Sequence, residues 1–144
     1  MAETDRIDTE GLLQPLADHV ATRPCRCGPM SFFSFDGPIG DSLAVYGEWA
    51  QPEIDFLTRL IPPGSIVVDA GANVGTHTLA FSRAVGDAGR VYAIEAQPQV
   101  FALLRRNAAG NCAAKVRSVN AAVSGAPGTI SIPALDPTRR ENVG

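Results

Sequence analysis

The residues best suited to chemistry form a glycine-containing turn at positions 69–75. They read Asp-Ala-Gly-Ala-Asn-Val-Gly and directly follow a short apolar, β-branched run. Gly71 lets the chain leave a strand sharply, and Gly75 lets the next helix and a ligand come close. The backbone N–H groups at the start of that helix are expected to face whatever is bound. The sequence therefore predicts a ligand site at this turn.

A second acidic residue, Glu95, ends the next apolar run, where a doubly wound fold places its acceptor of ribose hydroxyls. Two cofactor classes use this layout. Dinucleotide enzymes need G-x-G-x-x-G, but here Asn73 replaces the second glycine and Thr76 the third. The acid-x-G-x-G-x-G spacing of S-adenosylmethionine enzymes fits better, with Asp69, Asn73 and both glycines on its alternate positions. A plain Rossmann-like domain with a tight turn is the structural alternative.

Alternating strands and helices must position this turn. Apolar β-branched runs predict the strands, and apolar stripes bounded by proline and glycine predict the helices. The strands lie at 66–69, 91–95 and 115–119, and the helices at 52–60, 74–85 and 98–110. The first two strands are expected to be buried on both faces. This order predicts an α/β fold with a Rossmann-like parallel sheet, followed by a small hairpin at 121–132.

The first part of the chain is less regular. Apolar side chains at helical spacing predict a short helix at about 12–20, although a glycine and a proline interrupt it. Proline and glycine predict a loop at 23–30. Residues 30–47 read as short strands and turns. Three aromatic side chains of this stretch are expected in the core: Phe32, Phe33 and Phe35.

Charge and composition exclude several partners. The chain has 12 basic and 15 acidic residues and a net charge of −3, so no nucleic-acid partner is expected. No apolar run approaches the roughly 18 residues of a membrane span, and the polar N-terminus is unlike a signal peptide, so we expect a cytoplasmic protein without membrane contact. Cys25 and Cys27 are not expected to bind metal. A structural zinc site needs four ligands, and only Cys112, His19 and His77 remain, far along the chain.

Several separate stretches resemble the FkbM-type methyltransferase family, from about residue 39 to the end. They read IGDSLAVYGEW, IPPGSIVVDAGANVGTHTLAFSRAVGDAGRVYAIEAQPQVFALLRRN, VNAAVSGAPGTISIPALD and ENVG. The GANVGTHT block is the most specific of them. The resemblance implies a class I methyltransferase fold. It also implies methyl transfer from S-adenosylmethionine to a hydroxyl oxygen of a sugar, a polyketide or another small molecule, without a metal.

The resemblance also implies a set of cofactor-binding residues. Those lining the amino-acid tail and ribose would be Asp69, Gly71, Ala72, Asn73 and Gly75. Glu95 would accept hydrogen bonds from the ribose hydroxyls. The adenine would be edged by Ala96 and Gln97, with Asn120 and Ala121 on its other side.

Three residues have alternative interpretations. Asp69 suits a cofactor carrying an ammonium and a sulfonium, but it can also bond the N–H groups of its own turn. His77 could take the proton of the attacking hydroxyl as catalytic base, or simply pack at the helix start. Glu48 is a candidate contact for the methionine portion of the cofactor or for the substrate, and otherwise a member of a structural ion pair.

The resemblance predicts that part of the fold is missing. The family's sheet has seven strands with the fourth beside the first, whereas this sequence ends after three parallel strands and the hairpin. We therefore expect an N-terminal extension at 1–50, the cofactor-binding half of a methyltransferase domain at 51–144, and weak or no catalysis. The unpaired edge of the 66–69 strand is a candidate surface for self-association. The alternative functions are a nicotinamide-dependent oxidoreductase and a non-catalytic remnant or interaction module.

Overall fold

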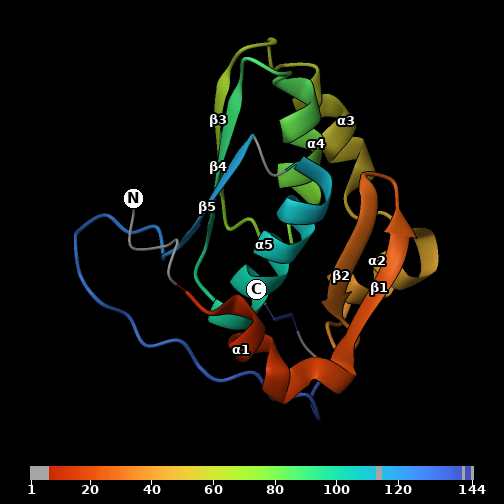
Figure 1. Ribbon diagram of the computed structural model, residues 1–144, viewed down its shortest axis with the longest axis vertical. Coiled ribbons are helices and arrows are strands. Elements are labelled where there is room, and N and C mark those ends of the chain that lie inside the picture. Colours follow the sequence, from red (N-terminus) through yellow and green to blue (C-terminus); the bar gives the residue numbers. More distant parts are fainter. Residues whose placement is uncertain (1–6, 113–114, 141, 144) are drawn as a thin grey trace.

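The computed structural model describes residues 7–112, 115–140 and 142–143, so Glu141 and Gly144 of the ENVG stretch lie outside the described residues. Its central element is a parallel sheet in the order β3–β4–β5 (Figure 1). The strands are β3 (Ile66–Ala70), β4 (Arg90–Glu95) and β5 (Val116–Asn120). Because Ala70 pairs with Ile94 and Glu95 with Asn120, the carboxyl ends of all three strands meet at one edge.

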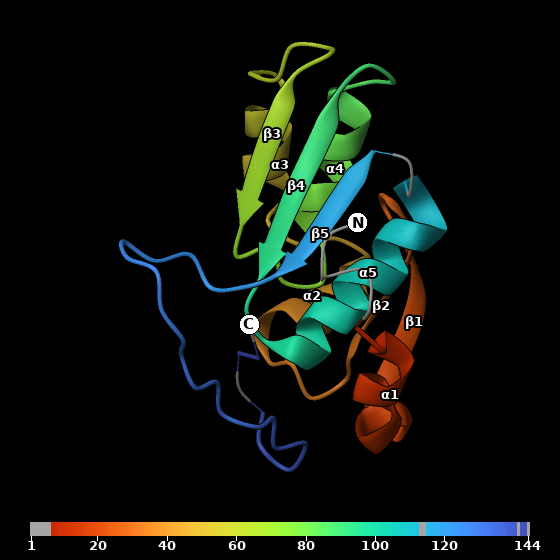
Figure 2. The same ribbon diagram turned by 60° about the vertical axis from the view of Figure 1, so that its left-hand side comes forward.

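Three helices pack against one face of this sheet. They are α3 (Gln51–Thr58), α4 (Thr76–Ala84) and α5 (Pro98–Cys112). Figure 1 shows the sheet edge-on with these helices on one side, and Figure 2, turned by 60° about the vertical axis, shows the three strands on their face. All the strands and helices predicted between residues 52 and 119 are present, within a few residues at their ends. The α/β class with a Rossmann-like parallel sheet is thereby confirmed.

The opposite face of the sheet is open, which corrects the prediction that β3 and β4 are buried on both faces. Ile66, Val68 and Tyr92 are 71%, 62% and 42% exposed, whereas Val91 and Ala93 point toward the helices and are fully buried. The reason is the path of the chain: both helices that connect neighbouring strands lie on the same face (Figure 1). An apolar run therefore predicts the strand, but it does not say which segment covers its second face.

Five elements precede the sheet. They are α1 (Thr9–Leu13), the 3-10 helix η2 (Gln14–His19), β1 (Val20–Cys25), β2 (Gly28–Phe33) and α2 (Pro38–Tyr46). The short helix expected at about 12–20 is present as α1 and η2. Proline near the start of η2 explains the change to the tighter 3-10 form, because proline cannot donate the next helical hydrogen bond.

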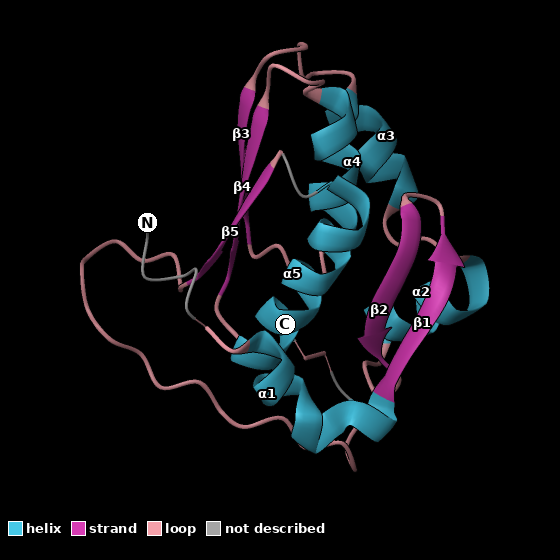
Figure 3. Ribbon diagram, in the orientation of Figure 1, coloured by secondary structure: helices cyan, strands magenta, loops and turns pink. Residues whose placement is uncertain are grey.

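The predicted loop at 23–30 is wrong, because this segment belongs to the antiparallel hairpin of β1 and β2 (Figure 3). Pro24 lies opposite Pro29 in that hairpin. A two-stranded sheet has two outer edges, and proline is tolerated in edge strands because its missing N–H costs no ladder bond there. The prolines were therefore poor evidence against strands at this place.

The prediction of strands and turns at 30–47 is confirmed in its first half, where β2 and a turn lie, and is wrong in its second half, which α2 occupies. Pro38 stands at the first helical position, where its fixed φ favours a helix. Gly47 ends α2 with a φ of 68°, and its N–H donates to the carbonyl oxygen of Leu43 at 3.1 Å. Proline at the start and glycine just past the end were the sequence signals for this helix.

The predicted hairpin at 121–132 does not form, as these residues contain no strand. They follow β5 as an irregular segment in which Val123 and Ile130 are 67% and 56% exposed. Apolar side chains stabilise a hairpin only when they pack on a neighbouring surface, and these two do not. The Gly-Ala-Pro-Gly sequence at 125–128 is a loop within a longer irregular stretch.

The main hydrophobic core lies between the N-terminal elements and the helices of the sheet. The predicted core residues Phe32, Phe33 and Phe35 are 1%, 0% and 5% exposed, and they belong to one cluster with Val74 and Val100. The core thus combines side chains from both sides of residue 50. Within the described parts of the chain, no helix has both the length and the apolar content needed to cross a bilayer.

Candidate functional site

The glycine turn lies at the carboxyl end of β3, and its backbone is bonded into the sheet. The N–H groups of Gly71 and Ala72 both donate to the carbonyl oxygen of Ile94 on β4, at 2.9 Å each. The N–H of Gly75 donates to the carbonyl oxygen of Ala72, also at 2.9 Å. These three N–H groups of the turn are therefore used within the protein. A pyrophosphate that drew on them would have to displace those hydrogen bonds.

Glu95, the last residue of β4, holds the same turn with its carboxylate. Its Oε2 accepts the N–H of Asn73 at 2.9 Å, and its Oε1 accepts the N–H of Gln97 at 2.8 Å. The side-chain oxygen of Asn73 accepts the N–H of Val74 at 2.7 Å. Glu95 is only 4% exposed, so these dipoles stabilise its buried charge. A carboxylate has roughly four acceptor sites, so acceptor capacity remains for ligand hydroxyls.

The residue types of the turn follow from its backbone conformation. Gly71, Asn73 and Gly75 have φ values of 78°, 49° and 97°. Glycine adopts positive φ without a Cβ clash, and asparagine tolerates it better than most other residues. Gly75 is also close to α5, because a Cβ at that position would lie 2.9 Å from Cδ1 of Leu104. Asn73 therefore takes the place of a glycine without changing the path of the turn.

Asp69 lies near the end of β3, and its carboxylate interacts with the start of α4. Oγ1 of Thr78 donates to Oδ2 of Asp69 at 2.5 Å. Burial raises the pKa of Asp69, while the Thr78 hydrogen bond and the nearby His77 oppose the rise. Asp69 therefore fixes the position of α4 relative to β3.

His77 occupies the first turn of α4 and faces α3. Its Nε2 lies 3.7 Å from Oε1 of Glu53, and its Nδ1 lies 3.4 Å from Oγ1 of Thr76. The ring packs edge-on against Phe81, with 5.7 Å between the ring centroids. The imidazole is thus held by packing, and it is also adjacent to open space beside the turn.

That open space is a groove of about 540 Å³ along the outer edge of β3. Asp69, Gly71 and His77 line the end of the groove that adjoins the turn. Apolar residues of α3 and of the segment after it, including Leu57 and Ile61, line the remainder. The groove can hold a partly apolar molecule with one polar end at the turn.

The predicted adenine contacts gather beyond the carboxyl ends of β4 and β5. Nδ2 of Asn120 donates to the carbonyl oxygens of Glu95 and Ala96, at 2.9 Å and 3.0 Å. Nε2 of Gln97 donates to the carbonyl oxygen of Pro133 at 2.9 Å. The structure therefore brings Ala96, Gln97 and Asn120 together around the tip that carries Glu95.

Glu48 lies apart from this tip. Its Oε2 accepts a hydrogen bond from Nη1 of Arg26 at 3.1 Å in an ion pair whose two side chains are 37% and 56% exposed. Its backbone carbonyl accepts the hydroxyl of Ser42 at 2.5 Å. Glu48 also lines a small hollow that reaches Thr76 at the start of α4. In this structure, Glu48 is therefore a member of an ion pair with Arg26.

Sequence reasoning missed Asn107, which joins the turn to the N-terminal hairpin. It is 3% exposed on α5. Its Oδ1 accepts the N–H of Ser31 at 2.7 Å, and its Nδ2 donates to the carbonyl oxygens of Ser31 and Val74 at 2.9 Å and 2.8 Å. The available signal was an amide within the inward-facing apolar stripe of its helix, because a buried amide needs partners.

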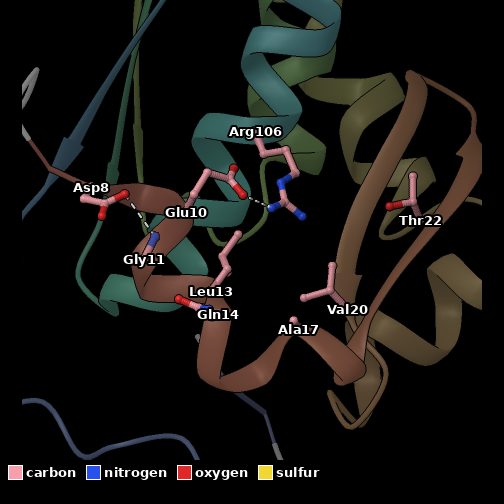
Figure 4. Close-up of a pocket in the computed structure, with 9 residues that line it drawn as sticks. All are labelled: Asp8, Glu10, Gly11, Leu13, Gln14, Ala17, Val20, Thr22 and Arg106. Atoms are coloured by element: carbon pink, nitrogen blue, oxygen red, sulfur yellow. Dashed lines mark hydrogen bonds and ion pairs between the residues drawn. The ribbon is translucent and has the colours of Figure 1, made fainter.

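A second hollow, of about 580 Å³, lies between α1, η2, β1 and α5 (Figure 4). Arg106 lines this hollow, and its Nη2 is paired with Oε2 of Glu10 at 2.6 Å. Asp8 caps α1, because its Oδ1 accepts the N–H of Gly11 at 3.0 Å. This hollow shares no residue with the glycine turn. Among the described residues, no group of three His, Cys, Asp or Glu side chains could hold a metal ion.

No protein-family model matches the chain, and no curated protein sequence matches it. Solved structures do match part of it. A SAM-dependent methyltransferase of Aquifex aeolicus is 22% identical over 58% of this chain and 43% of its own, with a TM-score of 0.47. A SAM-dependent O-methyltransferase of Thermotoga maritima is 18% identical over 68% and 39%, with a TM-score of 0.47.

Fibrillarin of Aeropyrum pernix, solved with bound S-adenosyl-L-methionine, is 16% identical over 72% of this chain and 52% of its own, with a TM-score of 0.43. The aligned parts take up 39% to 52% of these three chains, so this chain spans about half of their length or less. The likeness to these structures concerns the fold alone.

Proposed function

We propose that this chain binds S-adenosylmethionine across the carboxyl ends of β3, β4 and β5 and contributes the cofactor half of a methyltransferase. The observation that carries the proposal is the contact between Glu95 and the glycine turn, where Oε2 lies 2.9 Å from the nitrogen of Asn73. It places a buried carboxylate beside the turn, as the ribose of an adenosyl cofactor requires.

The three strand ends suit three parts of the cofactor. The groove end formed by Asp69, Gly71 and His77 would take the amino-acid part, with the Asp69 carboxylate near the ammonium and sulfonium charges. Glu95 would accept the ribose hydroxyls. The space beyond Ala96 would take the adenine. The strands are neighbours, so one elongated molecule can contact all three ends.

A nicotinamide dinucleotide is a poorer candidate for this turn. Its pyrophosphate needs free N–H groups, whereas those of Gly71, Ala72 and Asn73 already donate to Ile94 and Glu95. S-adenosylmethionine carries no phosphate and does not require these groups. The hydrogen bonding of the turn therefore favours the methyl donor.

The reaction we propose is methyl transfer to a hydroxyl oxygen. S-adenosylmethionine supplies an activated methyl group on a sulfonium, so the protein mainly has to align the acceptor, exclude water and receive a proton. His77 is the proposed proton acceptor, since its imidazole lines the groove beside Gly71. The FkbM-type resemblance of the sequence supports a sugar, a polyketide or another small molecule as the acceptor.

Thermal unfolding with added ligands tests this proposal. S-adenosylhomocysteine at about one hundred times its dissociation constant should stabilise the chain by about 2.7 kcal/mol and raise Tm by several degrees. NAD⁺ at the same concentration should leave Tm unchanged. A shift with NAD⁺ and none with S-adenosylhomocysteine would favour the oxidoreductase instead, and no shift with either would favour a non-catalytic module.

A further inference from the structure

β3 lies at an outer edge of the parallel sheet, and within the described parts of the chain no strand pairs with its outer side (Figure 2). Its inner side is bonded to β4 along the whole strand. Just before β3, the carbonyl oxygen of Ser65 accepts the N–H of Arg90 at 3.0 Å. Just after it, the N–H of Gly71 donates to the carbonyl oxygen of Ile94 at 2.9 Å. These two bonds fix which residues of β3 face β4.

The outer side of β3 carries the backbone groups of three residues. Successive residues of a strand direct their N–H and C=O groups to alternate sides, and Ser65 and Gly71 both bond to β4. The residues of even number between them, Ile66, Val68 and Ala70, therefore present both groups to the open edge. Their side chains are exposed on the uncovered face of the sheet. The edge thus offers hydrogen bonds and apolar surface together.

The usual protection of an edge strand is missing from β3. Exposed edges are commonly blocked by a lysine, a proline or another charged side chain on the strand. The one charged residue of β3 is Asp69, and its carboxylate turns away from the edge to accept the hydroxyl of Thr78 on α4. Nothing in the sequence of β3 therefore opposes pairing with a further strand.

The edge of β3 is complementary to itself. An antiparallel pair of β3 strands with a two-fold axis at Val68 places Val68 opposite Val68, and Ile66 opposite Ala70. All three residues direct their backbone groups outward, so each facing pair can exchange two hydrogen bonds. Every outward group of both strands is then satisfied, and apolar side chains lie opposite apolar side chains. A register shifted by one residue would lose these bonds.

Charges on α3 favour the same arrangement. Glu53, in the first turn of α3, lies 3.7 Å from His77 at the carboxyl end of β3, whereas the other end of α3 leads through 59–65 into the start of β3. α3 and β3 are therefore oppositely directed. Under the two-fold axis, the half of α3 that carries Glu53 and Asp55 lies toward the end that carries Arg59 in the second copy. The pairing of the strands thus brings opposite charges to the same place.

We propose that two copies of this chain pair through their β3 edges, antiparallel and centred on Val68, and join their three-stranded sheets into one. The axis is perpendicular to the sheet, so both copies keep their helices on the same face. The second copy also covers the outer side of the groove beside β3, which Asp69 and His77 line. The inference does not depend on the proposed function, since it follows from the geometry of the edge.

Sedimentation equilibrium of the full chain and its variants tests the pairing. The wild type should be a dimer at about 100 μM. Val68→Pro removes an N–H that faces the open edge and none that bonds to β4, so it should raise the dissociation constant of the dimer about one hundredfold. Val68→Lys places two like charges opposite each other across the axis and should also weaken the dimer. It decides the matter if Val68→Pro does not fold by circular dichroism.

Tyr92→Lys is the matched control, because Tyr92 is exposed on the same face of the sheet but lies on the central strand β4. Its dimer should dissociate within about twofold of the wild type. A dimer that Tyr92→Lys disrupts and the Val68 variants do not would show that the open faces stack, and it would overturn the edge pairing. Equal weakening by Tyr92→Lys and Val68→Lys would overturn it too, as would a monomeric wild type.

Amide hydrogen exchange of the wild type tests the register. The amides of Ile66, Val68 and Ala70 should be protected at concentrations where the dimer forms and exchange faster on dilution. Fast exchange at all three positions in a dimeric sample would contradict pairing through this edge. Ligand-induced shifts of Tm are measured separately, so the dimer and the proposed function can each fail while the other stands.

Discussion

Glu95 and Asp36 are both buried carboxylates, yet their surroundings differ. Glu95, 4% exposed beside the glycine turn, accepts one backbone N–H on each oxygen. Asp36, 0% exposed before α2, forms a well-oriented hydrogen bond with neither oxygen among the described residues. Burial raises the pKa of Asp36 to about 6, and the nearby backbone of Ile39 and Gly40 offsets only part of the rise.

The difference shows how a buried charge becomes useful. The carboxylate of Glu95 accepts hydrogen bonds from backbone dipoles, and the same bonds fix the turn. The charge of Asp36 has no comparable support and reduces the stability of the fold at neutral pH. Asn107 connects the glycine turn to the N-terminal hairpin that precedes Asp36, since it bonds both Ser31 in the hairpin and Val74 in the turn.

The largest loss of stability should come from replacing Asn107, which connects the glycine turn to the N-terminal hairpin. Asn107→Leu leaves the N–H of Ser31 and the carbonyl oxygens of Ser31 and Val74 without a partner, and we expect the free energy of unfolding to fall by about 3–4 kcal/mol. Asn111→Ala is the control on the same helix. Its partners lie near the surface, so the loss should be about 1 kcal/mol in urea unfolding.

Similar losses for Asn107→Leu and Asn111→Ala would contradict a special role for the buried amide. Binding gives a second measure of the connection. If Asn107 also positions the turn, Asn107→Leu should weaken S-adenosylhomocysteine binding at a temperature where the variant remains folded, and Asn111→Ala should not.

The next largest effect should come from neutralising Asp36. Its pKa is raised in the folded state, so the native protein binds this proton more tightly than the unfolded chain does. Its contribution to stability is greatest below pH 4 and is lost as the pH rises toward 6. Asp36→Asn should therefore match the wild type near pH 4 and exceed it by about 2–3 kcal/mol at pH 7.

Unfolding free energies measured between pH 4 and pH 8 check this difference. Asp41→Asn is the control, because Asp41 is half exposed and pairs with Arg140 at the surface. Its difference from the wild type should not grow between pH 4 and pH 7 in the way expected for Asp36→Asn. A gap between Asp36→Asn and the wild type that stays constant with pH would contradict an ionised, destabilising Asp36.

The smallest effect concerns the backbone of the turn. Both Gly71 and Gly110 have open space where a Cβ would stand, but only Gly71 has a positive φ, of 78°. Gly71→Ala should reduce the free energy of unfolding by about 1–2 kcal/mol, whereas Gly110→Ala, inside α5, should raise it by about 0.5–1 kcal/mol. Shifts of the same sign would show that strain does not set the glycine requirement at 71.

The sequence was most informative where local signals and tertiary structure agree. The parallel strands and their helices could be predicted because short apolar runs alternate with helical stripes between proline and glycine. The β1–β2 hairpin could not, because Pro24 and Pro29 indicate a loop unless their edge positions are known. The segment 121–132 shows the opposite error. Its turn residues predicted a hairpin, but its apolar side chains have no neighbouring surface to pack on, and no strand forms.

The candidate site shows the same division. Glu95 could be placed at the end of its strand from the apolar run before it. The orientation of the N–H groups of Gly71 and Ala72 could not, since it depends on where the carbonyl of Ile94 lies. Asn107 depends on contacts 76 residues away along the chain, which no local pattern contains.

The most direct test of the account is the affinity of S-adenosylhomocysteine for the wild type and for Glu95→Ala, measured by calorimetry well below the unfolding temperature of both. We expect one site in the wild type and a dissociation constant about ten- to one-hundredfold higher in the variant, since charged hydrogen bonds to the ribose are lost. Equal affinities would contradict it, as would a wild type that binds none.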